Sequence, residues 1–162
     1  ADQRSGGCNR LFNGRAIDAA TSFFTGVAVN PTADDLDVEV ERFRRKLDAG
    51  ADFAMTQIIF DLELLDQFFE RFGEPSPIPV LVGVFPVWSH PLALRLHNEV
   101  PGIVVPDHIQ EALRAAGPDG PKVGMELARE LVEASRSRAE GVYLVAPFRR
   151  PLGILELIAD AA

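Results

Sequence analysis

The stretch Lys46-Leu47-Asp48-Ala49-Gly50-Ala51-Asp52-Phe53-Ala54-Met55-Thr56-Gln57 decides the fold, because it joins the end of a helix to a short buried strand. Gly50 lies where a helix C-terminus favours a residue without a Cβ atom. Residues 53–55 are apolar and form a run short enough for a strand that is buried on both faces. Thr56 and Gln57 then place a hydroxyl and an amide at the carboxyl end of this predicted strand, the end that faces the ligand in parallel α/β folds. We therefore expect this pair to belong to a functional site.

The composition is that of one folded domain with an acidic surface. The chain has 162 residues, of which 47% are hydrophobic, and this is enough to supply a core. Its formal net charge of -8 argues against a general nucleic-acid or anionic-membrane binder, which needs a broad positive field. The single cysteine, Cys8, excludes an intramolecular disulfide. Because no apolar run could span a bilayer and residues 1–7 do not resemble a signal peptide, we expect a cytoplasmic protein.

Strand-like and helix-like segments alternate from residue 21 onwards. Residues 1–20 are polar and glycine-rich, and we expect a loop or lead-in segment there. The predicted strands are 22–29, 53–57, 80–85 and 141–146, and the predicted helices are 34–49, 62–72, 91–100, 107–116, 123–139 and 152–161. Glycine and proline at 117–121 predict a loop.

This alternation indicates βαβ units and a parallel sheet with right-handed crossovers. No glycine-rich phosphate loop of the Rossmann or Walker type follows a predicted strand, which favours a barrel over a dinucleotide-binding open sheet. The predicted class is therefore α/β, of the (β/α)8 TIM-barrel type. Four strands cannot close such a barrel, which needs eight.

Four basic residues cluster on one predicted helix of this acidic chain, namely Arg42, Arg44, Arg45 and Lys46. Three of them, Arg42, Arg45 and Lys46, stand at i, i+3 and i+4 and share a helix face. That face could hold a pyrophosphate, because arginine binds phosphate oxygens bidentately. The pattern alone favours the alternative, a solvated face with ion pairs such as Glu41 with Arg45.

Other polar side chains lie near the predicted strand ends. Gln57 could bind a heterocycle or could be satisfied by neighbouring backbone groups. Asn30 ends the first predicted strand, although Asn-Pro is also a common way to open a turn. Arg149 follows the last predicted strand, where it could meet a carboxylate or simply occupy a surface loop. The histidines show no metal-ligand spacing, so no metal site is predicted, and no Ser–His–Asp arrangement or acid pair assigns a catalytic residue.

The opening stretch resembles the methylenetetrahydrofolate reductase family. The residues Arg45-Lys46-Leu47-Asp48-Ala49-Gly50-Ala51-Asp52, followed by Thr56-Gln57 and Phe60-Asp61, match the run that marks the helix after the family's fifth barrel strand and the sixth strand itself. Further stretches agree in the same order, namely Gly26-Val27-Ala28-Val29-Asn30-Pro31, Pro79-Val80-Leu81-Val82-Gly83-Val84-Phe85-Pro86, Asn98-Glu99-Val100-Pro101-Gly102 and Gly141-Val142-Tyr143. The resemblance covers most of the chain and is closest to the form fused to a homocysteine S-methyltransferase domain.

The resemblance implies a fold, a cofactor and a reaction. The family fold is a (β/α)8 barrel that binds FAD. Its reaction, part of one-carbon metabolism and methionine biosynthesis, reduces 5,10-methylenetetrahydrofolate to 5-methyltetrahydrofolate with hydride from NADH or NADPH. A folate and NAD(P)H are therefore the expected small-molecule partners.

Cofactor contacts are implied at five positions. Arg45 and Lys46 would contact the FAD phosphates with Arg42 in support, and Ala28 and Asn30 would line the flavin side of the barrel mouth.

Substrate contacts are implied at three positions. Gln57 would hydrogen-bond the pterin of the folate, and Arg149 lies where a family arginine meets the substrate. Leu96 lies where some members carry a phenylalanine that stacks on the substrate.

Two catalytic segments of the family have no counterpart in residues 1–20. They are the first strand, with its glutamate, and the segment after the fourth strand, with its aspartate. The resemblance therefore implies that residues 21–162 form the C-terminal half of the barrel, with about the last four βα units. We expect negligible reductase activity for this chain alone, and association with itself or with a missing N-terminal half, because open sheet edges favour pairing. The alternative is a catalytically inactive half barrel that binds flavin weakly or only oligomerises.

Overall fold

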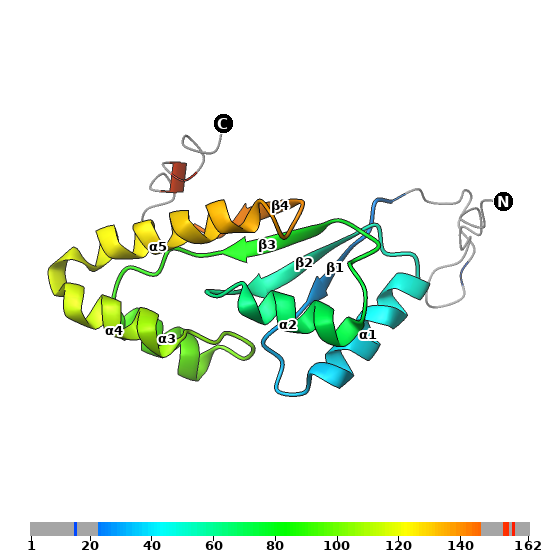
Figure 1. Ribbon diagram of the computed structural model, residues 1–162, viewed down its shortest axis with the longest axis horizontal. Coiled ribbons are helices and arrows are strands. Elements are labelled where there is room, and N and C mark those ends of the chain that lie inside the picture. Colours follow the sequence, from blue (N-terminus) through cyan, green and yellow to red (C-terminus); the bar gives the residue numbers. More distant parts are fainter. Residues whose placement is uncertain (1–14, 16–22, 147–153, 156, 158–162) are drawn as a thin grey trace.

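A computed structural model describes residues 15, 23–146, 154–155 and 157 of the chain (Figure 1). Strands and helices alternate through this part as the sequence predicted. In chain order the elements are β1 (Gly26–Val29), α1 (Leu36–Asp48), β2 (Phe53–Ile58), α2 (Glu63–Phe72), β3 (Val80–Val84), α3 (His90–Glu99), α4 (Asp107–Ala116), η1 (Gly117–Asp119), α5 (Gly120–Ser135) and β4 (Gly141–Leu144).

The four strands of the described residues form one parallel sheet in the order β1-β2-β3-β4. Each new strand is added on the same side of the previous one, whereas the strand order of a doubly wound sheet reverses at a switch point. The arrangement therefore fits a TIM-barrel-like fold and confirms the predicted α/β class. That the chain supplies only the last four units of such a barrel stays a prediction.

Local sequence signals account for the joints between these elements. Asp35 caps α1, and its Oδ1 accepts a hydrogen bond from the backbone N–H of Val38 at 3.0 Å. Gly50 and Gly73 follow α1 and α2 with φ of +90° and +91°, a conformation that a side chain disfavours. The joint between α1 and β2 is therefore as tight as the sequence predicted.

The core lies between one face of the sheet and the helices α1, α2 and α5. Alternate strand residues, such as Val29, Ala54 and Val80, pack against helix residues that include Phe43 and Phe68. A second apolar cluster joins β3 and β4 to α2 and α5. Figure 1 shows α3 and α4 beyond the ends to which the strands point. A third apolar cluster joins these two helices to the segment after β3 and to α5.

The predicted loop at 117–121 is wrong. Residues 117–119 form a 3-10 turn, and α5 begins directly at Gly120. A Cβ atom at Gly120 would lie 2.5 Å from the backbone oxygen of Trp88, and one at Gly124 would overlap the backbone oxygen of Val87. These two glycines thus let α5 approach the segment after β3 closely.

Two further predictions on the elements can be assessed in part. β2 continues to Ile58, so Thr56 and Gln57 lie inside the strand and not at its last residues. The predicted loop after residue 146 and most of the predicted helix at 152–161 lie outside the described residues. Among the helices of the described part, none has the length and apolar character needed to cross a membrane.

Candidate functional site

The carboxyl ends of the parallel strands meet at one edge of the sheet, and several predicted site residues lie there. Asn30 follows β1 directly, and Gln57 is the last residue but one of β2. In parallel α/β folds this edge is where ligands bind. The site is therefore built outward from the residues at this edge.

A buried carboxylate organises the edge beside β1. Glu39 of α1 is only 5% exposed, and its Oε1 accepts a hydrogen bond from the backbone N–H of Asn30 at 3.1 Å. Its two oxygens also pair with Arg42, at 3.3 Å, and with Lys46, at 3.6 Å. A carboxylate can remain buried when it is paired and hydrogen-bonded in this way.

Sequence reasoning missed Glu39. No role was expected for this residue from the sequence. The available signal was the spacing of Glu39, Arg42 and Lys46, because positions i, i+3 and i+7 lie on one helix face.

Lys46 reaches from the last turn of α1 to β1. Its Nζ donates a hydrogen bond to the carbonyl oxygen of Ala28 at 2.5 Å, and its side chain is 31% exposed. The structure thus brings together four of the five predicted cofactor residues, namely Ala28, Asn30, Arg42 and Lys46. Their predicted contacts with FAD stay predictions.

Arg45, the fifth predicted cofactor residue, lies apart from this group. Its side chain is 66% exposed and its Nε lies 3.9 Å from Glu41, as in the ion pair weighed from the sequence. Arg44 also points elsewhere, because it donates to the carbonyl oxygen of Phe72 at 2.8 Å and lies over the Phe72 ring. The basic run of the sequence therefore splits into residues with different surroundings.

Asn30 organises the turn that follows β1. Its Oδ1 accepts a hydrogen bond from the backbone N–H of Thr32 at 3.1 Å, which is an Asx turn. The Thr32 hydroxyl lies 2.7 Å from this oxygen and 2.5 Å from the carbonyl oxygen of Gly102, and its proton can serve one of them. The turn is thereby fastened to the turn after α3, where Gly102 has a φ of +76°.

Gln57 sits at an irregularity of the sheet. The register of β2 against β3 shifts between Met55 and Ile58, where β2 contains one residue more than β3. The side chain of Gln57 is half-buried, and its Oε1 accepts a hydrogen bond from the backbone N–H of Ile58 at 2.9 Å. Bulges of this kind often occur next to active sites, where they redirect a side chain.

The two remaining predicted substrate residues have different outcomes. Leu96 is half-buried and packs on the apolar cluster of α3 and α4, beside residues such as Phe85 and Val105. Its substrate contact stays a prediction. Arg149 lies outside the described residues.

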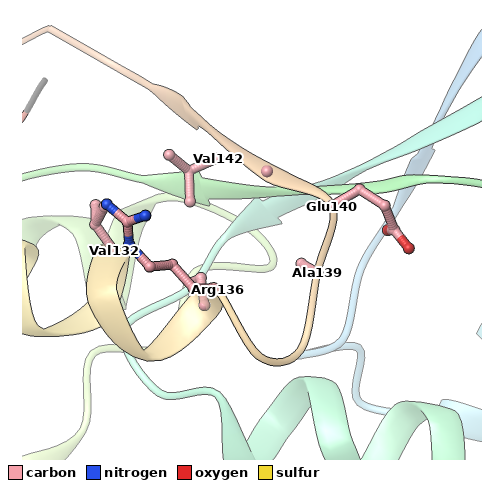
Figure 2. A pocket seen from close by; sticks show the side chains of 7 residues that line it. Val132, Arg136, Ala139, Glu140 and Val142 are labelled. Carbon is pink, nitrogen blue, oxygen red and sulfur yellow. The ribbon is translucent and has the colours of Figure 1, made fainter. Parts of the chain in front are cut away.

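A separate hollow lies at the other end of β4, between this strand and α5 (Figure 2). Its volume is about 340 Å³, and Val132, Arg136, Ala139 and Val142 are among its lining residues. Its polar groups have structural partners, since Glu140 accepts a hydrogen bond from the backbone N–H of Val80 and Arg136 pairs with Glu133. Nothing in this hollow matches the predicted site.

The described residues hold no group of three or more histidine, cysteine, aspartate or glutamate side chains arranged for a metal ion. The edge of the sheet where the carboxyl ends of the strands meet, here called the strand-end edge, carries cationic groups, amides and backbone polar groups. Such an edge can bind and orient an anionic or heterocyclic ligand.

Comparisons with known proteins agree on one family. The sequence pattern of the family described as methylenetetrahydrofolate reductase matches residues 16–146. Methylenetetrahydrofolate reductase 1 of Schizosaccharomyces pombe is 25% identical over 128 residues, which cover 72% of this chain and 21% of the yeast protein. Methylenetetrahydrofolate reductase 2 of Saccharomyces cerevisiae is 23% identical over 130 residues, which cover 75% of this chain and 22% of that protein. The chain thus spans about a fifth of these relatives.

A solved structure shares the fold. It is an uncharacterized protein from Clostridium thermocellum, described as binding two copies of 5-methyl-5,6,7,8-tetrahydrofolic acid. The TM-score is 0.56 at 16% sequence identity, and the match covers 84% of this chain and 52% of that one. At this identity the likeness speaks for the fold alone.

Proposed function

Since the chain belongs to the methylenetetrahydrofolate reductase family, as its motifs predicted, we propose that it supplies folate- and flavin-binding parts of an oxidoreductase that reduces 5,10-methylenetetrahydrofolate to 5-methyltetrahydrofolate with NAD(P)H. The single observation that carries this proposal is the family match over residues 16–146, which includes the whole strand-end edge.

The folate part of the proposal is supported by Gln57. Its amide lies at the ligand edge of the sheet and is not fully buried. The Clostridium thermocellum structure with the same fold is described as binding 5-methyltetrahydrofolic acid. We therefore assign Gln57 the role of a hydrogen-bonding contact to the pterin ring.

The residues beside β1 fit FAD. Ala28 has only a methyl side chain near the carboxyl end of β1, and Lys46 and Arg42 place two cationic groups next to this strand. Glu39 neutralises one of these charges, so a local positive charge remains for a diphosphate. Arg45, which is exposed, would add a further contact. When bound, FAD would supply the hydride carrier between the nicotinamide and the folate.

In this proposal the chain's own residues bind and orient. Lys46 and Arg42 hold negative charge in place, and Asn30 keeps the turn after β1 closed against Gly102. Gln57 fixes the ring of the substrate. Holding reactants in a set geometry is itself a large part of catalysis.

A second candidate function is association through the sheet edges. In the described residues β1 pairs only with β2 and β4 pairs only with β3, so each has one side without a neighbouring strand. An edge of this kind can add a strand from another chain. A polypeptide that oligomerises and is indifferent to FAD and folate would favour this candidate.

Binding measurements test the proposal. The purified protein should carry flavin absorbance or take up added FAD, and it should bind 5-methyltetrahydrofolate in a calorimetric titration. Gln57→Ala should weaken folate binding without changing flavin content, whereas Gln67→Ala, on the exposed face of α2, should change neither. A protein that binds neither FAD nor the folate would refute the proposal.

A further inference from the structure

Side-chain hydroxyls make hydrogen bonds with the backbone groups at the bulge in β2. From Met55 to Ile58 the strand advances three residues while β3 advances two, from Leu81 to Gly83. At this point the backbone N–H of Gly83 donates a hydrogen bond to the hydroxyl of Thr56 at 3.0 Å. The Thr56 hydroxyl in turn donates to the carbonyl oxygen of Gln57 at 2.7 Å.

Tyr143 supplies the remaining bond from two strands away. Its hydroxyl donates to the carbonyl oxygen of Thr56 at 2.6 Å, so a side chain of β4 reaches across β3 to β2. Gly83 makes this crossing possible, because a Cβ atom there would lie 2.5 Å from the Tyr143 oxygen. Two hydroxyls thus satisfy the carbonyls of Thr56 and Gln57, where a bulge disrupts the ladder.

The same bonds determine which end of the Gln57 amide a ligand meets. The backbone N–H of Ile58 can only donate, so the partner at 2.9 Å must be the amide oxygen of Gln57. In the described residues the Gln57 side chain has no other hydrogen bond, which leaves its NH2 group for a ligand. The peptide that carries this side chain is the one held by Tyr143 and Thr56.

We propose that Tyr143 is a positioning residue for the folate, which acts through Thr56 to fix Gln57 with its NH2 group toward an acceptor atom of the pterin. This inference rests on the proposed function, because the folate is the ligand that Gln57 would meet. Burial raises the pKa of the Tyr143 phenol, so its hydroxyl keeps the proton that it donates throughout the neutral range.

A double-mutant cycle tests the link. Calorimetry would measure 5-methyltetrahydrofolate affinity for the wild type, Tyr143→Phe, Gln57→Ala and the double variant. Loss of one hydrogen bond is worth about 1 kcal/mol, so Tyr143→Phe should weaken binding about fivefold. In the Gln57→Ala background the same change should weaken it no further. Flavin content should be unchanged by Tyr143→Phe.

Two controls separate positioning from a general loss of stability. Ser135→Ala removes a comparable hydroxyl-to-carbonyl bond, 2.7 Å long, from α5 and should leave folate affinity unchanged. Thr56→Ser keeps the hydroxyl at the bulge and should bind like the wild type, whereas Thr56→Val should weaken binding as Tyr143→Phe does. This pair answers the question even if the tyrosine variant does not fold.

The failures are distinguishable. A wild-type protein without folate affinity would overturn the folate part of the proposed function and this inference with it. A wild type that binds, with Tyr143→Phe equal to it or with losses that multiply in the double variant, would overturn the inference alone. Equal affinities of Thr56→Ser and Thr56→Val would do the same.

Discussion

Glu39 and Lys46 face each other along α1, with Oε1 3.6 Å from Nζ, although they are seven positions apart. The lysine also donates to the carbonyl oxygen of Ala28, so the pair connects the last turn of the helix to its first turn and to β1. One buried carboxylate therefore sets the direction of the cationic groups at the strand-end edge.

Replacing this carboxylate should destabilise the fold. In Glu39→Gln the amide can still accept from the N–H of Asn30, but Arg42 and Lys46 lose their counter-charge. Because both cations are partly in water, we expect a loss of about 1–2 kcal/mol, below that of a fully buried pair. Urea unfolding would measure it, with Glu41→Gln at an exposed position as the control. Equal unfolding midpoints for the two variants would contradict the structural role of Glu39.

The basic residues of α1 should divide into two functional groups. Arg44→Ala should lower the free energy of unfolding by about 1 kcal/mol, because it removes the bond to the carbonyl of Phe72 and the ring contact. Arg45→Ala should change stability by less than about 0.5 kcal/mol, since its side chain is exposed. Flavin uptake should respond in the reverse order. A variant of Arg44 that impairs flavin uptake more than Arg45→Ala would contradict this division.

Gly124 should tolerate no side chain. A Cβ atom there would overlap the backbone oxygen of Val87, and backbone cannot move aside as a flexible side chain can. We expect Gly124→Ala to cost about 3 kcal/mol, by overpacking. Gly50→Ala is the matched comparison, because its φ is +90° and nothing lies within 4 Å, so only backbone strain of about 1 kcal/mol acts there. Thermal unfolding of the two variants should rank them in this order.

The phenol of Tyr143 should ionise at a higher pH than an exposed tyrosine does. Burial raises the pKa of its phenol, so the folded state holds the proton more tightly than the unfolded chain does. The resulting stability is fully present below the ordinary tyrosine pKa of about 10 and is lost as the pH rises through the higher folded value. Tyr143 is the only tyrosine of the chain, so tyrosinate absorbance reports it alone. A folded protein that titrates at the same pH as the urea-unfolded protein would contradict the burial.

The order of elements was predictable because local chemistry marks each joint. Gly73 ends α2 with a positive φ, and α4 has the bounds that its sequence predicted. The helix predicted at 123–139 begins three residues earlier, at Gly120. Its start was placed too late because glycine and proline usually break helices, whereas a proline in the first turn loses no intrahelical hydrogen bond.

The site was predictable only in its location. The polar residues at strand ends were found, since strand and edge follow from the βα alternation. The bond from Tyr143 to Thr56 was not found, because it joins segments that lie 87 positions apart in the sequence. The partners of Glu39 are close in sequence, but its burial depends on how α1 packs beside β1. Such contacts depend on register, which a local pattern does not encode.

The extra residue in β2 has a consequence for the two halves of that strand. Ala54 and Ile59 both pack into clusters with helix residues, although they are an odd number of positions apart and would point to opposite faces of an uninterrupted strand. The extra residue shifts the in-and-out alternation of side chains by one position. Ala54 therefore packs in the cluster with α1 and α2, and Ile59, just after β2, packs in the cluster with α2 and α5. Deleting one residue at Thr56 or Gln57 would therefore turn Ile59 away from its cluster. The number of residues in this strand therefore determines which side chains reach the core.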